Sequence, residues 1–392
     1  MKKIIIVNNN MKIGGVQKSL HNLLWSIDTV NEYDVTLLLF SKNGDYAQKL
    51  PDSIKVKECK GFFRYLGKSQ GEYKSSLFDF LLRGFFVAVS RIISRAFAFR
   101  LMLLIEPMLD GEFDCAISFL HNGRKDAFYG GTQDYVLKCV KAKKKVAFIH
   151  GDYINCGAFH SANNRLLEKF DVIAACSDGC RDVLIQNLPE FDSKCMTVRN
   201  FHCFDEIMKM SEDNSVEYDE STVNVIMVAR LSHEKGIDRA IKAVAFCLEK
   251  NIKVKLHIVG GGSMEKQLKD LTKNLGVEEN VVFYGEQNNP YRYMKNSDLL
   301  LIGSYHEAAP LVIDEARYMR VPVLSTKTTS TNEMIVDSEC GWVCENSQEA
   351  LNNAFYNAVS DKQKLTALKK KLSLNIPDNT KTLLQFEKLT SK

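Results

Sequence analysis

Short runs of apolar residues recur along this chain, and most are followed by a longer segment whose apolar residues repeat every three or four positions. Such runs are typical of strands buried on both faces of a parallel sheet, and the longer repeats are typical of helices. The alternation predicts an α/β fold built from doubly wound parallel sheets. The expected strands are Ile4–Val7, Val35–Phe40, Ala116–Phe119, Val146–Ile149, Val172–Cys176, Val223–Val228, Val254–Val259, Val281–Tyr284, Leu299–Ile302 and Val321–Leu324.

The strands fall into two sets, which predicts two domains. A chain of 392 residues exceeds the size at which a single hydrophobic core keeps growing. Asn200–Ser221 lacks periodicity and contains an acidic, serine-bearing run, so we interpret it as a linker. The first domain is expected over residues 1–203 and the second over residues 204–377.

Composition excludes several classes of protein. A net charge of +4 is too mild to indicate a nucleic-acid partner. The eleven cysteines lack histidines at zinc-site intervals, so reduced thiols are expected. The start of the chain has only four consecutive apolar residues, which indicates a first strand and not a signal peptide. No apolar run reaches the length of a membrane span. The expected location is the cytoplasm, either free or peripheral at the inner membrane face.

Residues 61–105 depart from the alternation. They hold seven basic residues against two acidic ones, a balance of +5 that exceeds the net charge of the whole chain. From Leu81 onward, one stripe of an expected helix is polar and most of the remaining circumference is apolar. Such a helix can lie in the interface of an anionic membrane, and the alternative is a helix pair packed on the first domain. The stripe is formed by Arg83, Ser90, Arg91, Ser94 and Arg95.

Two acids, Glu307 and Glu315, follow the apolar run Leu299–Ile302. Ser304–Ala309 is expected to be the loop at the strand's C-terminal end, and Pro310 suits the first position of the next helix. Both acids can then face the crevice at the strand ends, where ligands bind in open α/β sheets. The alternative is an ordinary strand–loop–helix with solvated acids.

Two basic residues likewise follow another expected strand, Val223–Val228. Arg230 and Lys235 follow it closely, and Gly236 precedes an amphipathic segment. Two cations at a strand end suit a diphosphate leaving group, since charge develops on its oxygens as the bond breaks. A pair of surface cations is the alternative.

Two further loops of the first domain carry candidate residues. Gly14 and Gly15 follow the first strand and permit a tight loop whose N–H groups could face a phosphate, or they meet only the steric needs of the turn. His150 directly follows the strand Val146–Ile149, where a histidine is a better functional candidate than elsewhere. The lysines just upstream are interpreted as a solvated helix face and not as a binding patch. They are Lys138, Lys141 and Lys143–Lys145.

Together these pieces resemble the family 4 retaining glycosyltransferases of the GT-B fold, in which two Rossmann-like domains face each other across a cleft. The resemblance covers most of the chain in the family's order and is densest from 225 to 345. The blocks I-H-G-D-Y and N-P-Y-R-Y-M-K look most like bacterial enzymes that assemble capsule, exopolysaccharide or other cell-surface glycans. The other matching blocks are G-G-V, V-A-R-L-S-H-E-K-G-I-D, H-I-V-G-G-G, F-Y-G-E-Q-N-N and S-Y-H-E-A-A-P-L-V-I-D-E-A.

The resemblance implies roles for these residues. Arg230 and Lys235 would bind the donor's diphosphate, and Glu315 would hold the ribose hydroxyls. Glu307 would contact the donor sugar near its reacting face, which His150 would approach from the first domain. Glu307, His150, Lys235 and Arg230 are thus the expected catalytic residues. The expected donor-binding residues are Gly14, Gly15, Arg230, Lys235, Tyr284, Gln287, Glu307, Pro310, Leu311, Val312 and Glu315.

The implied reaction moves a sugar from a nucleotide diphosphate, a UDP-sugar on family frequency, to a glycan or lipid-linked oligosaccharide with retention at the anomeric carbon. No metal or other cofactor is expected, because cations and helix N–H groups can carry the leaving-group charge. Residues 61–105 are the expected point of any membrane contact. By the same resemblance, the first domain would lie on the acceptor side and the second would bind the nucleotide sugar. The final helix, within 378–392, would pack back on the first domain.

One departure leaves alternatives open. The family usually has glycine after the first acid, and here Ala308 and Ala309 follow Glu307. This motivates a catalytically idle homologue that binds a glycan or partner. A nucleotide-sugar 2-epimerase of the same fold is a second alternative. A glycogen-type phosphorylase is excluded because it needs a longer chain and a cofactor lysine.

Overall fold

The structure is a computed structural model, and it describes residues 1–391. The described chain divides into two compact units. Unit 1 is Met1–His202 together with the chain from Asn379 onward, and unit 2 is Cys203–Asp378. These limits lie one residue from the domain limits expected from the sequence. The acceptor-side and donor-side roles of the two units stay predictions.

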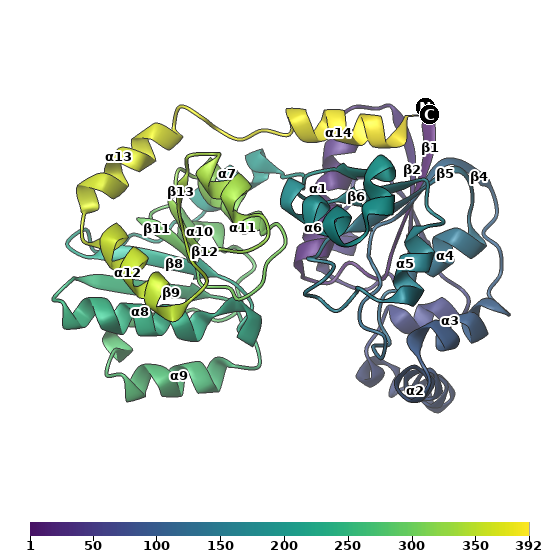
Figure 1. The fold of residues 1–392 in the computed structure, drawn as a ribbon, viewed down its shortest axis with the longest axis horizontal. Helices are drawn as coiled ribbons and strands as arrows, with labels where there is room; N and C mark the ends of the chain where they lie inside the picture. The colour runs from purple at the N-terminus through teal and green to yellow at the C-terminus, as the bar shows by residue number, and fades with distance from the viewer. Residues whose placement is uncertain (392) are drawn as a thin grey trace. The chain divides into compact units, whose positions relative to one another are not determined.

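Unit 1 is built on a parallel sheet with strand order β3-β2-β1-β4-β5-β6-β7 within residues 1–391. Helices connect the strands in chain order (Figure 1). Its strands are β1 (Lys2–Asn8), β2 (Tyr33–Leu39), β3 (Lys55–Glu58), β4 (Glu112–Ser118), β5 (Lys141–Ile149), β6 (Val172–Ala175) and β7 (Cys195–Thr197). Its helices are α1 (Gly15–Asp28), α2 (Leu77–Ile92), α3 (Arg95–Leu103), α4 (Thr132–Cys139), α5 (Ser161–Leu167), α6 (Asp178–Asn187) and α14 (Thr380–Thr390).

The middle of β1, Ile4–Val7, is apolar throughout because both faces of the sheet are covered. Along β1, Ile4 and Ile6 enter one core cluster, while Ile5 and Val7 enter the other. Successive side chains of a strand point to opposite faces, so a sheet covered on both sides selects a continuous apolar run. Helices α1 and α14 contribute to the first cluster, and α3, α4, α5 and α6 contribute to the second.

Helix α14 lies against the core of unit 1, although it comes from the far end of the chain (Figure 1). The ring of Phe386 is fully buried and meets the rings of Tyr33 and Phe201 at centroid distances of 5.6 and 6.2 Å. At the start of the helix, Asn379 exchanges hydrogen bonds with the backbone N–H and C=O of His202. The C-terminal helix thus completes one face of the first sheet.

Unit 2 is built on a second parallel sheet, with strand order β10-β9-β8-β11-β12-β13 in the described chain. Its strands are β8 (Val223–Val228), β9 (Val254–Val259), β10 (Val281–Phe283), β11 (Leu299–Ile302), β12 (Val323–Thr326) and β13 (Gly341–Cys344). Its helices are α7 (Phe204–Glu212), α8 (Ile237–Glu249), α9 (Glu265–Asn274), α10 (Tyr291–Met294), α11 (Leu311–Tyr318), α12 (Gln348–Val359) and α13 (Lys362–Leu372). Helices α8, α9 and α12 cover one face, and α7, α10 and α11 cover the other. Helix α13 contributes Leu365 to the first core cluster and Leu372 to the second.

Two local predictions were wrong. The expected linker contains helix α7, whose Ile207 is buried and whose Phe204 stacks on Tyr318 at 4.6 Å. The lysines Lys141 and Lys143–Lys145 lie on strand β5 and not on a helix. Their strand pairs with β4 along its length, so backbone pairing fixes the segment as a strand even where its side chains are polar. In both segments, tertiary contacts outweigh a weak local pattern.

Residues 61–105 form a packed helix pair, α2 and α3, and not one continuous helix. The break falls at Ile93 and Ser94, where the Ser94 hydroxyl accepts a hydrogen bond from Phe97 N–H and caps α3. Two arginines of the expected polar stripe are structural. Arg95 is 1% exposed, and Arg83 donates hydrogen bonds to the carbonyls of Tyr65 and Lys68 and to Gln70.

The cysteines and the lengths of the helices bear on two expectations from the composition. The eleven cysteines are all free thiols, most of them buried. Within residues 1–391, no helix combines the length and apolar character needed to cross a membrane.

The packing of α14 predicts which unit loses stability when that helix is weakened. Phe386→Ala should destabilise unit 1 by about 3–5 kcal/mol, the usual loss for a buried phenylalanine. Urea unfolding followed by tryptophan fluorescence can check this, because Trp25 lies in α1 and Trp342 in β13. A Trp342→Phe background leaves Trp25 as the reporter of unit 1, and a Trp25→Phe background leaves Trp342 as the reporter of unit 2.

The matched control is Leu384→Ala on the same helix, whose side chain is 61% exposed. It should change the free energy of unfolding by less than about 0.5 kcal/mol. An equal loss from both variants, or a loss reported by Trp342 alone, would contradict the assignment of α14 to unit 1.

Candidate active site

The strand order of unit 2 reverses beside β8. Strand β8 pairs with β9 on one side and with β11 on the other. The chain continues from β8 to β9 and from β11 to β12, so these two connections lead toward opposite edges of the sheet. In open α/β sheets, ligands bind at such a switch point, beyond the carboxyl ends of the strands. Here the loops that follow β8 and β11 carry the predicted cations and the first predicted acid.

The structure brings Lys235 and Glu307 together at this point. The Lys235 ammonium donates a short, charge-assisted hydrogen bond to Oε1 of Glu307. The two side chains are 22% and 14% exposed, so the pair is largely shielded from solvent. Ser304 Oγ donates to the same carboxylate oxygen at 3.1 Å. Glu307 is therefore held between a cation and a hydroxyl, and the solvated-acid alternative does not describe it.

Close backbone contact places the two loops. Gly236 adopts φ +59° just before α8, a left-handed conformation that favours glycine. A Cβ added at Gly236 would lie 2.0 Å from the carbonyl oxygen of Gly303, directly after β11. The loops can approach this closely only because no side chain stands between them, and Lys235 precedes Gly236 by one residue.

A buried arginine reinforces the contact. Arg239, 3% exposed on α8, donates to the carbonyl of Gly303 at 3.2 Å and to Oδ1 of Asn346 at 2.7 Å. Asn346 in turn donates to the carbonyls of Tyr305 and Lys327 at 3.1 and 2.9 Å. These bonds fix the loops after β8, β11 and β12 relative to one another. Sequence analysis missed Arg239, although its place one turn after Lys235 was a usable signal.

The other predicted residues of unit 2 are spread around this centre. Arg230 lies on the loop after β8 with 73% of its side chain exposed, and its guanidinium is 4.0 Å from Glu234. Glu315 lies in the second turn of α11 and is 2% exposed. Leu311 and Val312 form the first turn of α11. Pro310 is the N-cap, with extended backbone, and Leu311 is the first helical residue, so the predicted helix start was wrong by one residue.

Tyr284 and Gln287 follow β10. The Tyr284 hydroxyl lies 3.1 Å from Nδ1 of His257, and its ring packs on Tyr293 at 4.4 Å. Gln287 donates to the carbonyl of Tyr284 at 2.7 Å, which closes a short turn. The Tyr284 ring is therefore committed to internal packing. A role for this stretch at the nucleotide base stays a prediction and rests on the backbone after Tyr284.

Unit 1 has its own switch point, between β1 and β4. Gly14 and Gly15 stand where the loop after β1 enters α1. His150 follows β5, and its ring packs on Phe119 and Phe148 at centroid distances of 4.3 and 5.3 Å. Burial, aided by the nearby His121, lowers the pKa of His150 to about 3. Its ring is neutral at pH 7, and its buried Nε2 has no hydrogen-bond partner among the described residues.

His121 is a neighbour that sequence analysis missed. It follows β4 as His150 follows β5, and the local sequences S-F-L-H and A-F-I-H are alike, which was the available signal. The backbone N–H of His150 donates to Nδ1 of His121 at 3.3 Å. His121 Nδ1 is thus an acceptor and its proton is on Nε2, which lies 3.6 Å from the sulfur of Cys156. Burial lowers the pKa of His121 to about 4.

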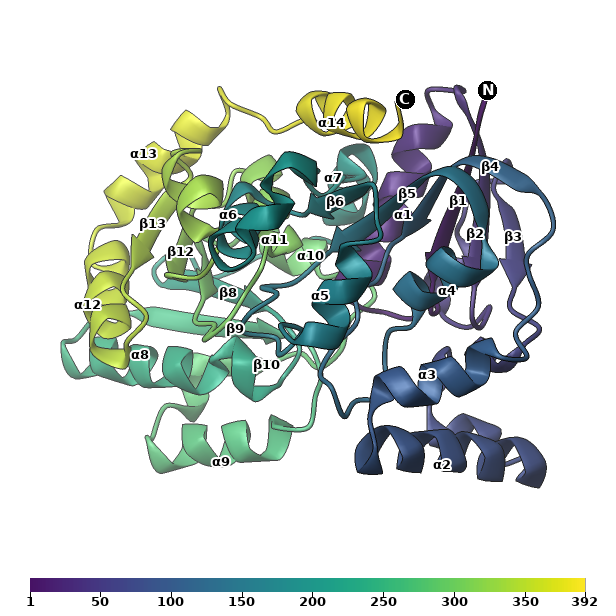
Figure 2. The same cartoon turned by 45° about the vertical axis from the view of Figure 1, so that its right-hand side comes forward.

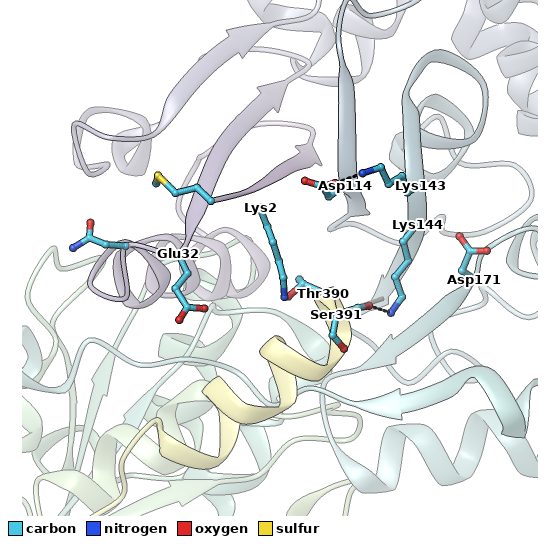
Figure 3. A pocket seen from close by; sticks show the side chains of 10 residues that line it. Lys2, Glu32, Asp114, Lys143, Lys144, Asp171, Thr390 and Ser391 are labelled. Carbon is cyan, nitrogen blue, oxygen red and sulfur yellow. Dashed lines mark hydrogen bonds and ion pairs between the residues drawn. The ribbon is translucent and has the colours of Figure 1, made fainter.

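A large cavity of unit 1 lies elsewhere. It has a volume of about 950 Å³ and is lined at the amino ends of β1 and β4 and on β5, beside the end of α14 (Figure 3). Lys144 donates to the carbonyl of Ser391 at its rim, and Lys143 pairs with Asp114 at 2.7 Å. This is the sheet edge opposite to the one that His150 leaves. Among residues 1–391, no three His, Cys, Asp or Glu side chains group as a metal site would require.

Comparison with known proteins identifies relatives of this chain. Residues 210–373 match the family described as Glycosyl transferases group 1. Lipopolysaccharide glucosyltransferase WaaG of Escherichia coli is 36% identical over 128 residues, which cover 32% of this chain and 34% of that protein. A Campylobacter jejuni enzyme, N-acetylgalactosamine-N,N'-diacetylbacillosaminyl-diphospho-undecaprenol 4-alpha-N-acetylgalactosaminyltransferase, is 29% identical over 193 residues, 48% of this chain and 51% of that protein. The chain thus spans about a third to a half of these relatives' length.

The likeness to solved structures extends over the whole fold. The crystal structure of Staphylococcus aureus TarM in complex with UDP and saccharide ligands superposes with a TM-score of 0.70 at 15% identity, covering 100% of both chains. The predicted GT-B fold, with two Rossmann-like parallel-sheet domains, is confirmed.

The half-buried histidine pair, His121 and His150, predicts an acid-sensitive unit 1. Between about pH 6.5 and 4, the unfolded chain protonates both rings and the folded chain does not, so the free energy of unfolding falls as pH falls. His121→Asn keeps an acceptor for His150 N–H and removes one titrating ring. The variant should lose less stability over this range, by up to about 1.4 kcal/mol per pH unit.

Urea unfolding of Trp342→Phe variants at a series of pH values checks the prediction through Trp25. The control is His233→Asn, which removes an exposed histidine from unit 2. An unchanged pH slope in His121→Asn would mean that His121 is protonated in the folded protein.

Proposed function

We propose, from the match of residues 210–373 to the family described as Glycosyl transferases group 1, that the chain is a retaining glycosyltransferase that uses a nucleotide-diphosphate sugar. The observation that carries the proposal is the Lys235–Glu307 pair at the switch point of unit 2. A donor bound there would contact both the Lys235 ammonium and the Glu307 carboxylate, which are largely shielded from solvent. Those are the two charges that cleavage of a sugar–diphosphate bond requires.

The donor's diphosphate would take Lys235 as its first partner. An anion that displaces Glu307 from Lys235 exchanges one ion pair for another, so the ammonium is never left buried and unpaired. Arg230, exposed on the same loop, supplies a second cation. The first N–H groups of α11, at Leu311 and Val312, are not used within a helix and favour an anion.

Glu307, once released, would face the sugar, and Glu315 the ribose. A carboxylate near the anomeric carbon stabilises the positive charge that develops there as the bond to the diphosphate breaks. In unit 1, the neutral ring of His150, with Nε2 unpartnered among the described residues, suits a hydrogen bond to a sugar hydroxyl. The proposed roles of Gly14 and Gly15 rest on the sequence alone.

The proposed step breaks the bond between the anomeric carbon and the diphosphate oxygen. The acceptor hydroxyl oxygen forms a bond to that carbon on the same face, and the hydroxyl proton passes to the departing diphosphate. The products are the glycosylated acceptor and the nucleoside diphosphate. We propose that no metal is required, since Lys235, Arg230 and the α11 N–H groups carry the leaving-group charge.

UDP is the proposed nucleotide, supported by the UDP complex of the similar TarM structure. The proposed acceptor is a glycan or lipid-linked oligosaccharide of cell-surface polysaccharide synthesis, supported by the names of the similar WaaG and Campylobacter enzymes. Ala308 and Ala309, beside Glu307, lie where they can alter which sugar fits.

A donor panel tests the proposal. Purified protein is incubated with UDP-, GDP- and ADP-sugars, with and without a chelator, and release of nucleoside diphosphate is measured alongside calorimetric binding. The proposal expects one donor class to bind and to be slowly hydrolysed, with or without the chelator. Conversion to an epimeric nucleotide sugar would favour the epimerase, and binding without turnover to any acceptor would favour the idle homologue. Absence of binding to every donor would count against transfer.

Lys235→Ala and Glu307→Ala should each lower turnover of the accepted donor by about two to four orders of magnitude, the scale of a lost transition-state charge contact. Each variant removes one half of the pair at the switch point. Steady-state release of nucleoside diphosphate measures the effect.

The matched controls are Lys242→Ala and Glu265→Ala, which each remove one member of an exposed i,i+4 ion pair of unit 2. They should change turnover by less than about threefold, because exposed pairs contribute little. Near-normal turnover in Lys235→Ala or Glu307→Ala would sink the site assignment.

A further inference from the structure

Helices α2 and α3 leave a large apolar surface uncovered. Of the twenty large apolar side chains that are exposed within residues 1–391, ten lie between residues 77 and 108. Leu77 and Phe78 are each 72% exposed and Ile92 is 82% exposed. Scattered single exposures are normal, but a contiguous set of this size marks an interaction surface. The ten are Leu77, Phe78, Leu81, Phe85, Ile92, Ile93, Phe97, Leu104, Ile105 and Met108.

The exposed apolar residues of α2 form one stripe. Leu77, Leu81, Phe85, Ala88 and Ile92 recur every three or four positions, so they share one side of the helix. The opposite side, with the buried residues Phe86 and Ser90, packs inward. In Figures 1 and 2, α2 is the outermost helix at the lower end of unit 1, and α3 lies between it and the sheet. We call the exposed side chains of residues 77–108 the α2–α3 face.

The α2–α3 face carries net positive charge. Residues 74–108 contain five basic residues and two acids, a balance of 5 − 2 = +3. Arg83 and Arg95 are turned inward, whereas Lys74, Arg91 and Arg100 are exposed. Of the acids, Asp79 is neutralised by Arg64 at 2.9 Å, and Glu106 accepts hydrogen bonds from the backbone N–H groups of Phe62 and Phe63. The net charge at the solvent boundary of the face is therefore positive.

The helix pair is fastened to the loops at the switch point of unit 1. The loop after β1 is held by Lys12, which pairs with Glu72 at 2.7 Å just before α2, and by Asn10, which donates to the carbonyl of Gly67. The loop after β4 is held by the buried Arg95, which donates to the carbonyls of Gly123 and Arg124. Whatever binds the α2–α3 face is thus held at a fixed position relative to the carboxyl ends of β1 and β4.

We propose that the α2–α3 face docks unit 1 on an anionic lipid bilayer. The apolar stripe of α2 enters the interface, and Lys74, Arg91 and Arg100 contact lipid phosphates. A second copy of this chain fits the face less well, because the contact would bring together the like charges of Lys74, Arg91 and Arg100 from both copies. The proposal deepens the proposed function, on which the lipid-linked acceptor rests, and docking would bring that acceptor toward the carboxyl ends of β1 and β4. Docking itself does not require sugar transfer.

Vesicle co-sedimentation tests the proposal with the full chain. The wild-type protein should bind vesicles of phosphatidylglycerol and phosphatidylcholine more tightly than vesicles of phosphatidylcholine alone, and added salt should weaken binding to the anionic vesicles. Leu81→Glu with Phe85→Glu should reduce the fraction bound by more than about tenfold, because two carboxylates would enter the interface. Arg91→Glu with Arg100→Glu should weaken binding to the anionic vesicles by a similar factor.

The controls separate docking from folding and from catalysis. Leu384→Glu changes an exposed apolar residue on α14, and Lys266→Glu changes an exposed cation on α9; neither should alter vesicle binding. The face variants should keep the wild-type thermal transition and donor hydrolysis, whereas a failure of the proposed function would remove hydrolysis and leave vesicle binding intact. Wild-type protein that ignores vesicles, face variants that bind them normally, or a dimer that the face variants disrupt without any lipid binding would each overturn the proposal.

Discussion

The contact between Lys235 and Glu307 depends on the closeness of two strand ends, and the candidate site depends on that contact. Gly236 and Gly303 let the loops after β8 and β11 meet without side chains between them. Arg239 and Asn346 then hold the backbone of these loops through hydrogen bonds. The ammonium of Lys235 and the carboxylate of Glu307 pair with each other there while largely shielded from solvent. A diphosphate can replace the carboxylate without creating an unpaired charge, which releases the acid toward the sugar.

Much of the fold follows from the sequence because central parallel strands must be apolar on both faces. All ten expected strands are present, and the three strands that the pattern missed, β3, β7 and β13, lie at sheet edges within residues 1–391. An edge strand such as Lys55–Glu58 is paired on one side only and carries polar residues, so its pattern resembles a loop. The lysines of β5 were misassigned for the same reason, since backbone pairing and not side-chain pattern makes them a strand.

The candidate site was predictable in its residue types but not in its supports. The spacing of cations and acids after two strands places Lys235 and Glu307 at one sheet edge. Nothing in that spacing identifies Asn346 or Ser304 as groups that hold them, and only its place one turn after Lys235 points to Arg239. His121 is similar, because its bond to His150 needs the register of β4 against β5. For residues 61–105 the sequence left a membrane-interface helix and a packed helix pair as alternatives. The helix pair packs on unit 1 through Phe86 and Phe99 and still leaves an apolar face exposed.

The proposed reaction requires that the switch point of unit 2 holds the donor's diphosphate. A crystal structure of the full chain with UDP tests this through the distance from the β-phosphate oxygens to Nζ of Lys235. We expect a separation of about 3 Å, with the Lys235–Glu307 contact opened. A nucleotide bound elsewhere, for example in the unit 1 cavity beside Lys144 (Figure 3), with the Lys235–Glu307 contact intact, would contradict it.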